Sequence, residues 1–287
     1  MPVRTPVNPR ETLTEPGPTE FPSLGFSDMP SAPASDKNIL LAADTSTRYC
    51  TVAVCRMGAD FQEPLRLLAE TAVDRHRLHS ERLIATVDWA LKEADTTLHQ
   101  LGMLAISNGP GSFTGLRIGS AAWKGLALAC GLPLVAVPTL DAMSRLVAPA
   151  DALVVPMLDA RMNEVFGAVY RYEAGVRHRL TQDLVCPVET LLAAIPQDLA
   201  LPLIVIGDGA ERFAETIQQL RPEAVFMPPA LSMPRASTVA LEALSMLSAG
   251  ACTDPGAVSP VYLRKSQPEM IRDVKNADGG GGGKGHV

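Results

Sequence analysis

Two aspartates that each end an apolar run are the first candidates for chemistry. Asp44 follows the run Ile39–Ala43 and opens the tetrad Asp44-Thr45-Ser46-Thr47, and Asp159 follows the run Ala152–Leu158. The backbone amides of such a turn can cup a phosphate, and an aspartate can hold a hydrated magnesium ion. The same residues also form ordinary turns that only reverse the chain. From the residues alone, both interpretations stay open.

The partner turn weakens the phosphate interpretation. Asp159-Ala160-Arg161-Met162-Asn163 contains no glycine, although a phosphate-binding hairpin needs a close backbone approach. Gly207-Asp208-Gly209 is typical of a nucleotide-facing turn, but equally of a plain connection between a strand and a helix. The sequence therefore predicts at most a vestigial nucleotide cleft with little ATP hydrolysis, formed by Asp44, Thr45, Ser46, Asp159, Gly207 and Gly209.

The loop Gly109-Pro110-Gly111-Ser112-Phe113-Thr114-Gly115 is the most unusual stretch. It lacks the lysine and the spacing of a phosphate-binding P-loop, and Ser112 is not in a nucleophile elbow. We interpret it as a contact loop in which Phe113 fits a partner's pocket. Small residues then follow along one face of the helix 116–130, which indicates either packing inside the chain or a helix–helix interface with another chain.

Histidines and cysteines do not form a recognisable metal or redox site. His76 and His79 are three residues apart, and no carboxylate or cysteine stands at an obvious position to complete a metal site. None of the five cysteines forms a C-x-x-C pair. The sequence predicts no bound metal, no catalytic residues and reduced thiols.

Composition excludes several classes of protein. The 287-residue chain carries a net charge of −6, which argues against nucleic-acid binding by the chain alone. It has no apolar run long enough to span a membrane, so we expect a cytoplasmic protein. Residues 1–36 hold eight of the 24 prolines and are predicted to be a disordered leader, and residues 268–287 a flexible glycine-rich tail.

The remaining chain shows the same order of elements twice. Each half reads as three strands, a helix, a strand, a helix, a strand and a helix, and each opens with an apolar strand that ends in an aspartate. In the first half the two main helices are expected at 79–94 and 116–130, and a helix at 237–247 completes the second half. This order predicts an α/β protein with two duplicated lobes, at 37–148 and 149–267, and a cleft between them. It is the arrangement of the RNase H-like actin, hexokinase and sugar-kinase superfamily.

Several segments between residues 38 and 265 resemble one family. ILLAADTSTRYCTVAV, HSERL, SNGPGSFTGLRIGSAAWKGLA, PTLDAM, PMLDARMNEVFGAVY and PVYLRK are together similar to the TsaB (YeaZ) family. The resemblance implies a non-catalytic accessory subunit in the formation of threonylcarbamoyladenosine in tRNA. It further implies pairing with the catalytic paralogue TsaD through helices of the first lobe, with TsaE joining them, and a homodimer when the chain is alone. ATP and metal would sit on the partner subunits, and tRNA would be reached only through the complex. In the catalytic paralogue, two histidines spaced as H-x-x-x-H hold the metal. Here Leu83 stands four residues after His79, in the position of the second histidine, which fits the loss of that metal site.

The resemblance and the small-residue helix predict the same interface, on the helices 79–94 and 116–130. Its predicted residues are His79, Ser80, Leu83, Ile84, Val87, Phe113, Leu116, Ile118, Gly119, Ala122, Trp123 and Leu126. A change such as Leu83→Asp is then expected to abolish the complex while the chain stays folded. Two alternatives remain open. One is an ATP-dependent small-molecule kinase that uses Asp44 and Asp159 around magnesium, and the other is a metallopeptidase.

Overall fold

The computed structural model describes residues 37–58, 64–74, 79–147, 151–196, 200–250 and 254–264, with only the backbone for residues 79–82. The predicted leader and tail, and the candidate ligand His76, lie outside the described residues. Among the helices of the described part, none is long and apolar enough to cross a membrane.

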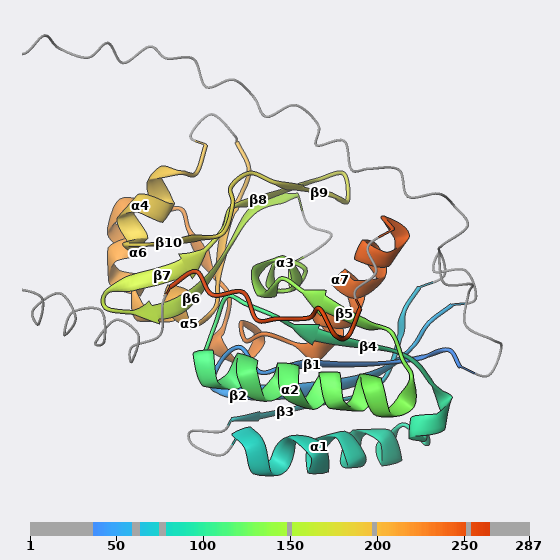
Figure 1. Ribbon diagram of the computed structural model, residues 1–287. Helices are drawn as coiled ribbons and strands as arrows, with labels where there is room; N and C mark the ends of the chain where they lie inside the picture. The colour runs from blue at the N-terminus through green and yellow to red at the C-terminus, as the bar shows by residue number, and fades with distance from the viewer. Residues whose placement is uncertain are drawn as a thin grey trace, which may run out of the picture. The chain divides into compact units, whose positions relative to one another are not determined.

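A five-stranded sheet forms the first half of the fold (Figure 1). Its strands in chain order are β1 (Ile39–Asp44), β2 (Tyr49–Arg56), β3 (Arg66–Asp74), β4 (Leu101–Ser107) and β5 (Leu134–Val137). Their order across the sheet is β3-β2-β1-β4-β5. The three strands β3, β2 and β1 are antiparallel neighbours, whereas β1, β4 and β5 run parallel.

The second sheet repeats this topology. Its strands are β6 (Ala152–Arg161), β7 (Glu164–Gly167), β8 (Tyr170–Glu173), β9 (Val176–Arg179), β10 (Leu184–Cys186), β11 (Leu203–Ile206) and β12 (Val225–Phe226). Along the path β10-β7-β6-β11-β12, the strands β10, β7 and β6 are antiparallel neighbours, whereas β6, β11 and β12 run parallel. The β8–β9 hairpin is added, with β8 antiparallel to β6. The predicted α/β fold and its duplication are confirmed by the repeated sheet topology.

Both central strands are buried on both faces, which explains their continuous apolar sequences. In β1, Ile39, Leu41 and Ala43 belong to one core cluster, and Leu40 and Ala42 belong to the cluster on the opposite face. Successive side chains of a strand point to opposite faces, so one apolar run serves two cores. β6 does the same in the second half.

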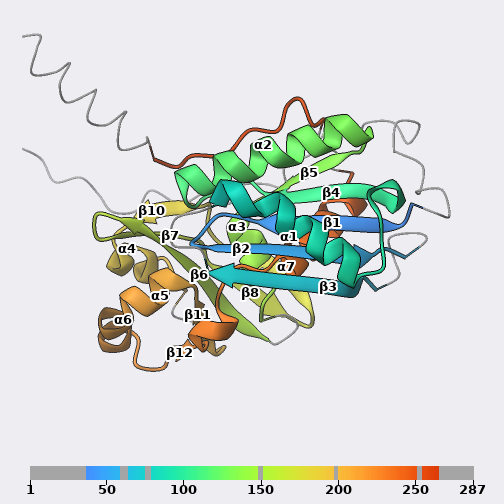
Figure 2. The same ribbon diagram turned by 90° about the horizontal axis from the view of Figure 1, so that it is seen from below.

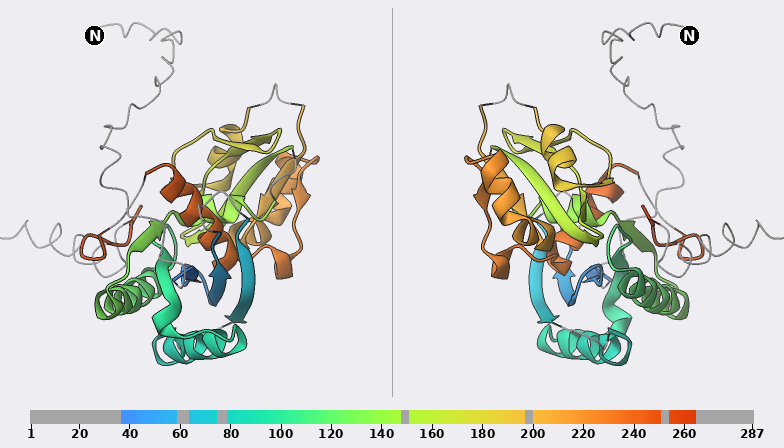
Figure 3. Two further views of the ribbon diagram at one scale, coloured as in Figure 1. Left: turned by 90° about the vertical axis from the view of Figure 1, so that its right-hand side faces the viewer. Right: turned by 90° about the vertical axis from the view of Figure 1, so that its left-hand side faces the viewer.

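Helices pack on both faces of each of the two sheets. Their bounds are α1 (His79–Glu93), α2 (Phe113–Cys130), α3 (Thr139–Ser144), α4 (Val188–Ala193), α5 (Asp208–Arg212), α6 (Ala214–Leu220) and α7 (Ala236–Ser248), with short 3-10 turns η2 (Leu98–Gln100) and η3 (Pro229–Leu231). α1 and α2 lie side by side on the face of the first sheet that is turned away from the second sheet (Figure 3). α4 and α6 contribute to the core cluster on one face of the second sheet, and α3 to the cluster on its other face.

The position of α7 differs from the sequence expectation. The predicted helix at 237–247 was expected to complete the second half, but α7 contacts β1, β2, β4 and β5 of the first sheet, and it also contacts α3. Its Val239, Ala240 and Ala243 are fully buried against that sheet. α7 therefore packs on the first sheet, although it follows the second half in the sequence.

The start of one helix also differs. α2 begins at Phe113 rather than at Leu116, because Ser112 is its N-cap and accepts a hydrogen bond from the Gly115 amide. In the second half, Phe213 separates the short helix α5 from α6. Gly131 is the C-cap of α2, in the left-handed conformation with φ 64°.

Candidate functional site

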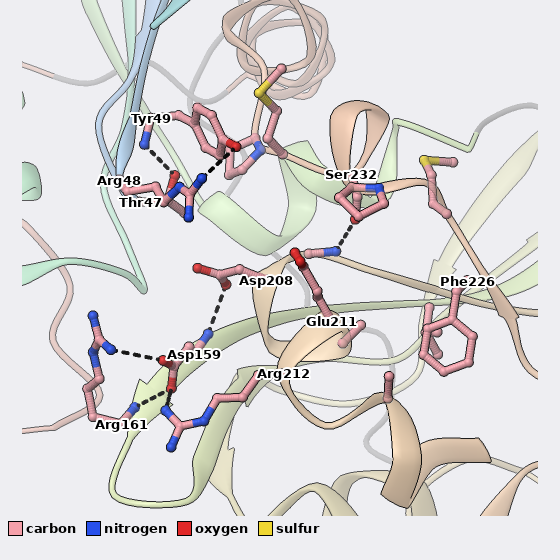
Figure 4. A pocket seen from close by; sticks show the side chains of 18 residues that line it. Thr47, Arg48, Tyr49, Asp159, Arg161, Asp208, Glu211, Arg212, Phe226 and Ser232 are labelled. Carbon is pink, nitrogen blue, oxygen red and sulfur yellow. Dashed lines mark hydrogen bonds and ion pairs between the residues drawn. The ribbon is translucent and has the colours of Figure 1, made fainter. Parts of the chain in front are cut away.

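A pocket of about 730 Å³ lies between the turn after β1 and the second half of the fold (Figure 4). The first half contributes Thr47, Arg48 and Tyr49 to its lining. The second half contributes Asp159 and Arg161 from the β6–β7 hairpin, Asp208, Glu211 and Arg212 from α5, and an apolar wall that includes Val205, Phe226, Met227 and Met233. The turns after the two equivalent first strands thus face one pocket, as the duplication predicts.

Asp44 does not reach this pocket. The residue is 1% exposed, and its Oδ1 accepts hydrogen bonds from the Ser46 amide at 2.9 Å and from the Ser46 hydroxyl at 2.8 Å. Burial raises the pKa of the Asp44 carboxyl, and the hydrogen bonds from Ser46 only partly oppose that effect. A carboxyl that is enclosed in this way is not available to a magnesium ion in the cleft.

Thr45 and Ser46 of the first turn also make contacts inside the protein. The Thr45 hydroxyl donates to the Gly115 carbonyl oxygen at 2.9 Å, and the Ser112 amide donates to the Ser46 carbonyl oxygen at 2.6 Å. Thr45 and Ser46 therefore hold the start of α2, and of the tetrad only Thr47 lines the pocket. The interpretation as a structural turn fits the geometry.

The β6–β7 hairpin is braced by ion pairs. Asp159 Oδ1 accepts from Arg212 Nη1 at 2.7 Å and from the Arg161 amide at 2.8 Å. Arg161, Met162 and Asn163 have φ of 65°, 51° and 59°, a conformation that costs a non-glycine residue about 1 kcal/mol or more. The hairpin thus keeps a strained shape with Asp159 already occupied by two arginines.

The carboxylates of α5 change the electrostatics of the pocket. Asp208 Oδ1 accepts from the Asp159 amide at 3.0 Å, and burial raises the pKa of Asp208. Neither Asp208 nor Glu211 forms an ion pair with a cation in the described part of the chain. Arg48, Arg161 and Arg212 line the same pocket, but each is already paired with an aspartate, Asp74 or Asp159. Because Asp44 is enclosed and Asp159 is paired with two arginines, the two aspartates that the sequence suggested for a magnesium nucleotide are not available to it.

The predicted cleft residues are brought together only in part. Asp159 and Gly207 line the pocket, whereas Asp44, Thr45, Ser46 and Gly209 do not. Since the kinase alternative needs Asp44 beside magnesium, it has no geometric support here. Within the described residues there is also no group of three His, Cys, Asp or Glu side chains that could hold a metal ion.

The predicted interface residues divide into two sets. Leu83, Val87, Leu116 and Trp123 are at most 5% exposed and belong to the chain's own core or its margin, and Gly119 is buried as well. Ile84 is 60% exposed, and Ile118, Ala122 and Leu126 are half-buried. The side chains of His79 and Ser80 lie outside the described residues.

The expectation for Leu83→Asp is therefore wrong. Leu83 is 1% exposed and packs in the core under α1. An aspartate there buries an unpaired charge, which costs at least about 3 kcal/mol. The change is expected to unfold the chain, so it cannot report on an interface.

Phe113 also differs from its expected role. Its ring lies 4.7 Å from the ring of Tyr262, and the Arg117 guanidinium lies 3.9 Å from its centroid. The chain's own C-terminal segment thus takes the place that we expected for a partner's pocket.

Sequence reasoning missed several surface residues of the two helices. Trp89 on α1 is 47% exposed and Leu128 on α2 is 68% exposed. Gly125 is exposed, and a Cβ atom added to it would meet nothing within 4 Å. For α2 a signal was present, because its sequence is apolar on most sides and such a helix has a second face to cover. The exposed positions Ile84, Trp89, Gly125 and Leu128 of α1 and α2 are together called the outer face here, and they surround the two helices broadly, since Ile84 and Trp89 are about 140° apart around α1.

Comparisons with known proteins identify the family. Residues 68–271 match a family model described as TsaD, tRNA N6-adenosine threonylcarbamoyltransferase. The chain is 30% identical over 241 residues to the tRNA threonylcarbamoyladenosine biosynthesis protein TsaB of Haemophilus influenzae. The aligned region covers 78% of this chain and 93% of that protein. This chain belongs to the TsaB family. TsaB of Escherichia coli is likewise 30% identical over 239 residues, with 79% and 95% of the two chains covered.

A solved TsaB-family structure agrees with the fold. YeaZ from Pseudomonas aeruginosa superposes with a TM-score of 0.65 at 29% identity, and the match covers 79% of this chain and all of that chain. The resemblance to the TsaB (YeaZ) family is thus confirmed from sequence and from structure.

Proposed function

We propose that this chain is an accessory subunit in the formation of N6-threonylcarbamoyladenosine in tRNA, that it acts in the cytoplasm, and that it binds and activates TsaD. Membership of the TsaB family supports the pathway. The cleft supports the absence of catalysis by this chain, because Asp44 is enclosed and Asp159 is held by two arginines. ATP and metal are then supplied by the partner subunits, TsaE is a further partner, and tRNA is reached only within the complex.

The observation that carries the partner proposal is the outer face of α1 and α2. Ile84, Trp89 and Leu128 expose large apolar side chains there, although the inner face of the same helices is fully packed on the first sheet. Gly125 leaves room for the backbone of another helix to approach. Burial of one leucine-sized side chain contributes about 1.5–3 kcal/mol before ordering costs. The same face would close a homodimer when TsaD is absent.

The test uses a charge on an exposed position. Ile84→Asp should leave the chain folded, because the side chain is 60% exposed, and should weaken binding to the cognate TsaD at least about tenfold, as expected for loss of a central apolar contact. Leu220→Asp is the matched control, since Leu220 is 51% exposed on α6 of the second half. Equal affinity of wild type and Ile84→Asp for TsaD in isothermal titration would disprove the interface.

Activity and oligomeric state complete the test. Threonylcarbamoylation of tRNA by TsaD and its partners should fall when Ile84→Asp replaces wild type, and should not fall with Leu220→Asp. Light scattering of the isolated chain should show a dimer for wild type and a monomer for Ile84→Asp. Threonylcarbamoyl transfer by the isolated chain would contradict an accessory role.

A further inference from the structure

The described C-terminal segment, residues 254–264, runs along α2 and is called the strap here (Figure 2). Its Val258 is 2% exposed and belongs to the core cluster under α2. Lys124 Nζ on α2 donates to the carbonyl oxygens of Gly256 at 3.2 Å and Val258 at 2.9 Å. The strap is thus anchored at its middle on the helix of the proposed partner face.

Next along the strap, Val261 and Tyr262 hold the start of α2. The Val261 amide donates to the Asn108 carbonyl oxygen at 2.7 Å, and a Cβ on Gly109 would stand 2.4 Å from the Val261 carbonyl oxygen. Glycine at 109 therefore permits the strap to lie this close. Arg117 Nε donates to the Tyr262 hydroxyl at 3.1 Å, so that Tyr262 fastens the first turns of the helix.

The end of the strap reaches the other half of the fold. Arg264 Nη1 donates to the Ala160 carbonyl oxygen at 3.1 Å, and its guanidinium forms an ion pair with Glu164. Both partners belong to the β6–β7 hairpin, whose Asp159 and Arg161 line the cleft pocket. A continuous set of contacts therefore leads from the cleft to the first turns of α2.

We propose that the strap couples the β6–β7 hairpin to the start of α2, with Tyr262 and Arg264 as positioning residues for the partner face. The part that concerns the partner rests on the proposed function. Movement of the hairpin would move Arg264, and through Tyr262 it would move Arg117 and Phe113. A ligand or protein that shifts the hairpin would then alter the affinity of α2 for its partner, and partner binding would in turn favour the same position of the hairpin.

The first experiment uses the isolated full chain and needs no partner. Arg264→Ala should increase amide hydrogen exchange in residues 113–118 about fivefold, although Arg264 contacts none of them, because the strap would no longer be fixed at its far end. Arg221→Ala is the control, since it removes the ion pair with Glu223, which lies away from the strap. Arg264→Lys should restore most of the protection, because it keeps the charge opposite Glu164.

The same variants are then titrated with the cognate TsaD. Arg264→Ala and Tyr262→Ala should each weaken binding about fivefold, while Arg221→Ala should bind as wild type does. Unchanged exchange at 113–118 in Arg264→Ala would overturn the coupling, and so would an increase spread evenly over β4 and β11, which would show loss of stability only. If wild type does not bind TsaD, the proposed function fails, and the exchange result still decides the coupling within the chain.

Discussion

Thr45 and Gly115 are fixed to one another across the first half of the fold. The Thr45 hydroxyl donates to the Gly115 carbonyl oxygen at 2.9 Å, and a Cβ atom on Gly115 would stand only 2.0 Å from the Thr45 carbonyl oxygen. This contact sets the distance between the β1–β2 turn and α2. It explains why a turn with the composition of a phosphate site has a structural role here.

Two glycines of α2 should respond to alanine in opposite ways. Gly125→Ala should stabilise the chain by about 0.5–1 kcal/mol, because alanine is the better helix former and its methyl group meets nothing within 4 Å. Gly115→Ala should destabilise it by about 1–3 kcal/mol, because the methyl group overlaps the backbone of Thr45. Urea unfolding of the two variants gives both values. Stabilisation by both changes would mean that the Thr45 contact yields easily.

Trp89 should report partner binding directly. The chain has two tryptophans, of which Trp89 is 47% exposed and Trp123 is 1% exposed. Trp123 Nε1 has no hydrogen-bond partner among the described residues, so Trp123→Phe loses no hydrogen bond and should still fold. In that variant, acrylamide should quench the remaining fluorescence strongly in the free chain and weakly with TsaD bound. Equal quenching in both states would place Trp89 outside the interface.

Titration of Asp44 should make the folded chain less stable as pH rises. Its pKa in the folded chain is raised above the ordinary value of 3.8 by burial, so the folded state holds the proton more tightly than the unfolded state. The stability that this provides is complete below pH 3.8 and is lost as pH rises through the folded pKa. Asp44→Asn should therefore flatten this part of the pH profile of the unfolding free energy, and it should not be less stable than wild type at pH 7. A profile identical to that of wild type would contradict the shift.

Cys55 should resist thiol reagents. It is fully buried in β2, and burial, with a smaller effect from Glu70, raises the pKa of its thiol to about 12. Because the thiolate is the reactive form, Cys55 should stay unmodified at pH 8 in the folded chain, whereas the half-buried Cys130 reacts. Peptide mapping after alkylation measures both, with the urea-unfolded chain as the control. Rapid labelling of Cys55 would show that β2 opens readily.

Much of the fold could be predicted because each half has a consistent local pattern. Apolar runs followed by Asp44 and Asp159 marked β1 and β6, and both strands do occupy the centres of their sheets. The destination of α7 could not be predicted. An amphipathic pattern shows that a helix buries a face, but not which sheet receives it.

The sequence could predict which residue types belong to the candidate site, but not which of their side chains are buried. Leu83 and Ile84 are both apolar and adjacent, so the sequence could not show that one enters the core and the other remains 60% exposed. Asp44 likewise has the same residue type whether it faces a cleft or is enclosed by Ser46. The fold decides between these states, because it places the start of α2 over the turn.

Glu242 joins α7 to the second half of the fold. It is 4% exposed, accepts from Arg177 Nη2 at 2.7 Å, and forms an ion pair with Arg145. Arg177 also donates to the Asp141 carbonyl oxygen at 2.8 Å, which ties β9 to α3. Burial tends to raise the pKa of Glu242, but Arg177 and Arg145 outweigh it and hold the pKa below the ordinary 4.5.

Glu242→Gln should therefore destabilise the chain in a pH-dependent way. At pH 7 the loss should be about 3 kcal/mol, because two mostly buried guanidinium groups lose their counter-ion. A carboxyl with a lowered folded pKa provides stability that is present above the unfolded value of 4.5 and is lost as pH falls through the folded value. The difference in unfolding free energy between wild type and variant should therefore shrink in acid, as urea titrations at several pH values would measure.

The control is Glu173→Gln, at an exposed pair with Arg171, which should cost less than about 1 kcal/mol at any pH in the same titrations. Equal stability of Glu242→Gln and wild type at pH 7 would show that the junction between α7 and the second half does not depend on this charge.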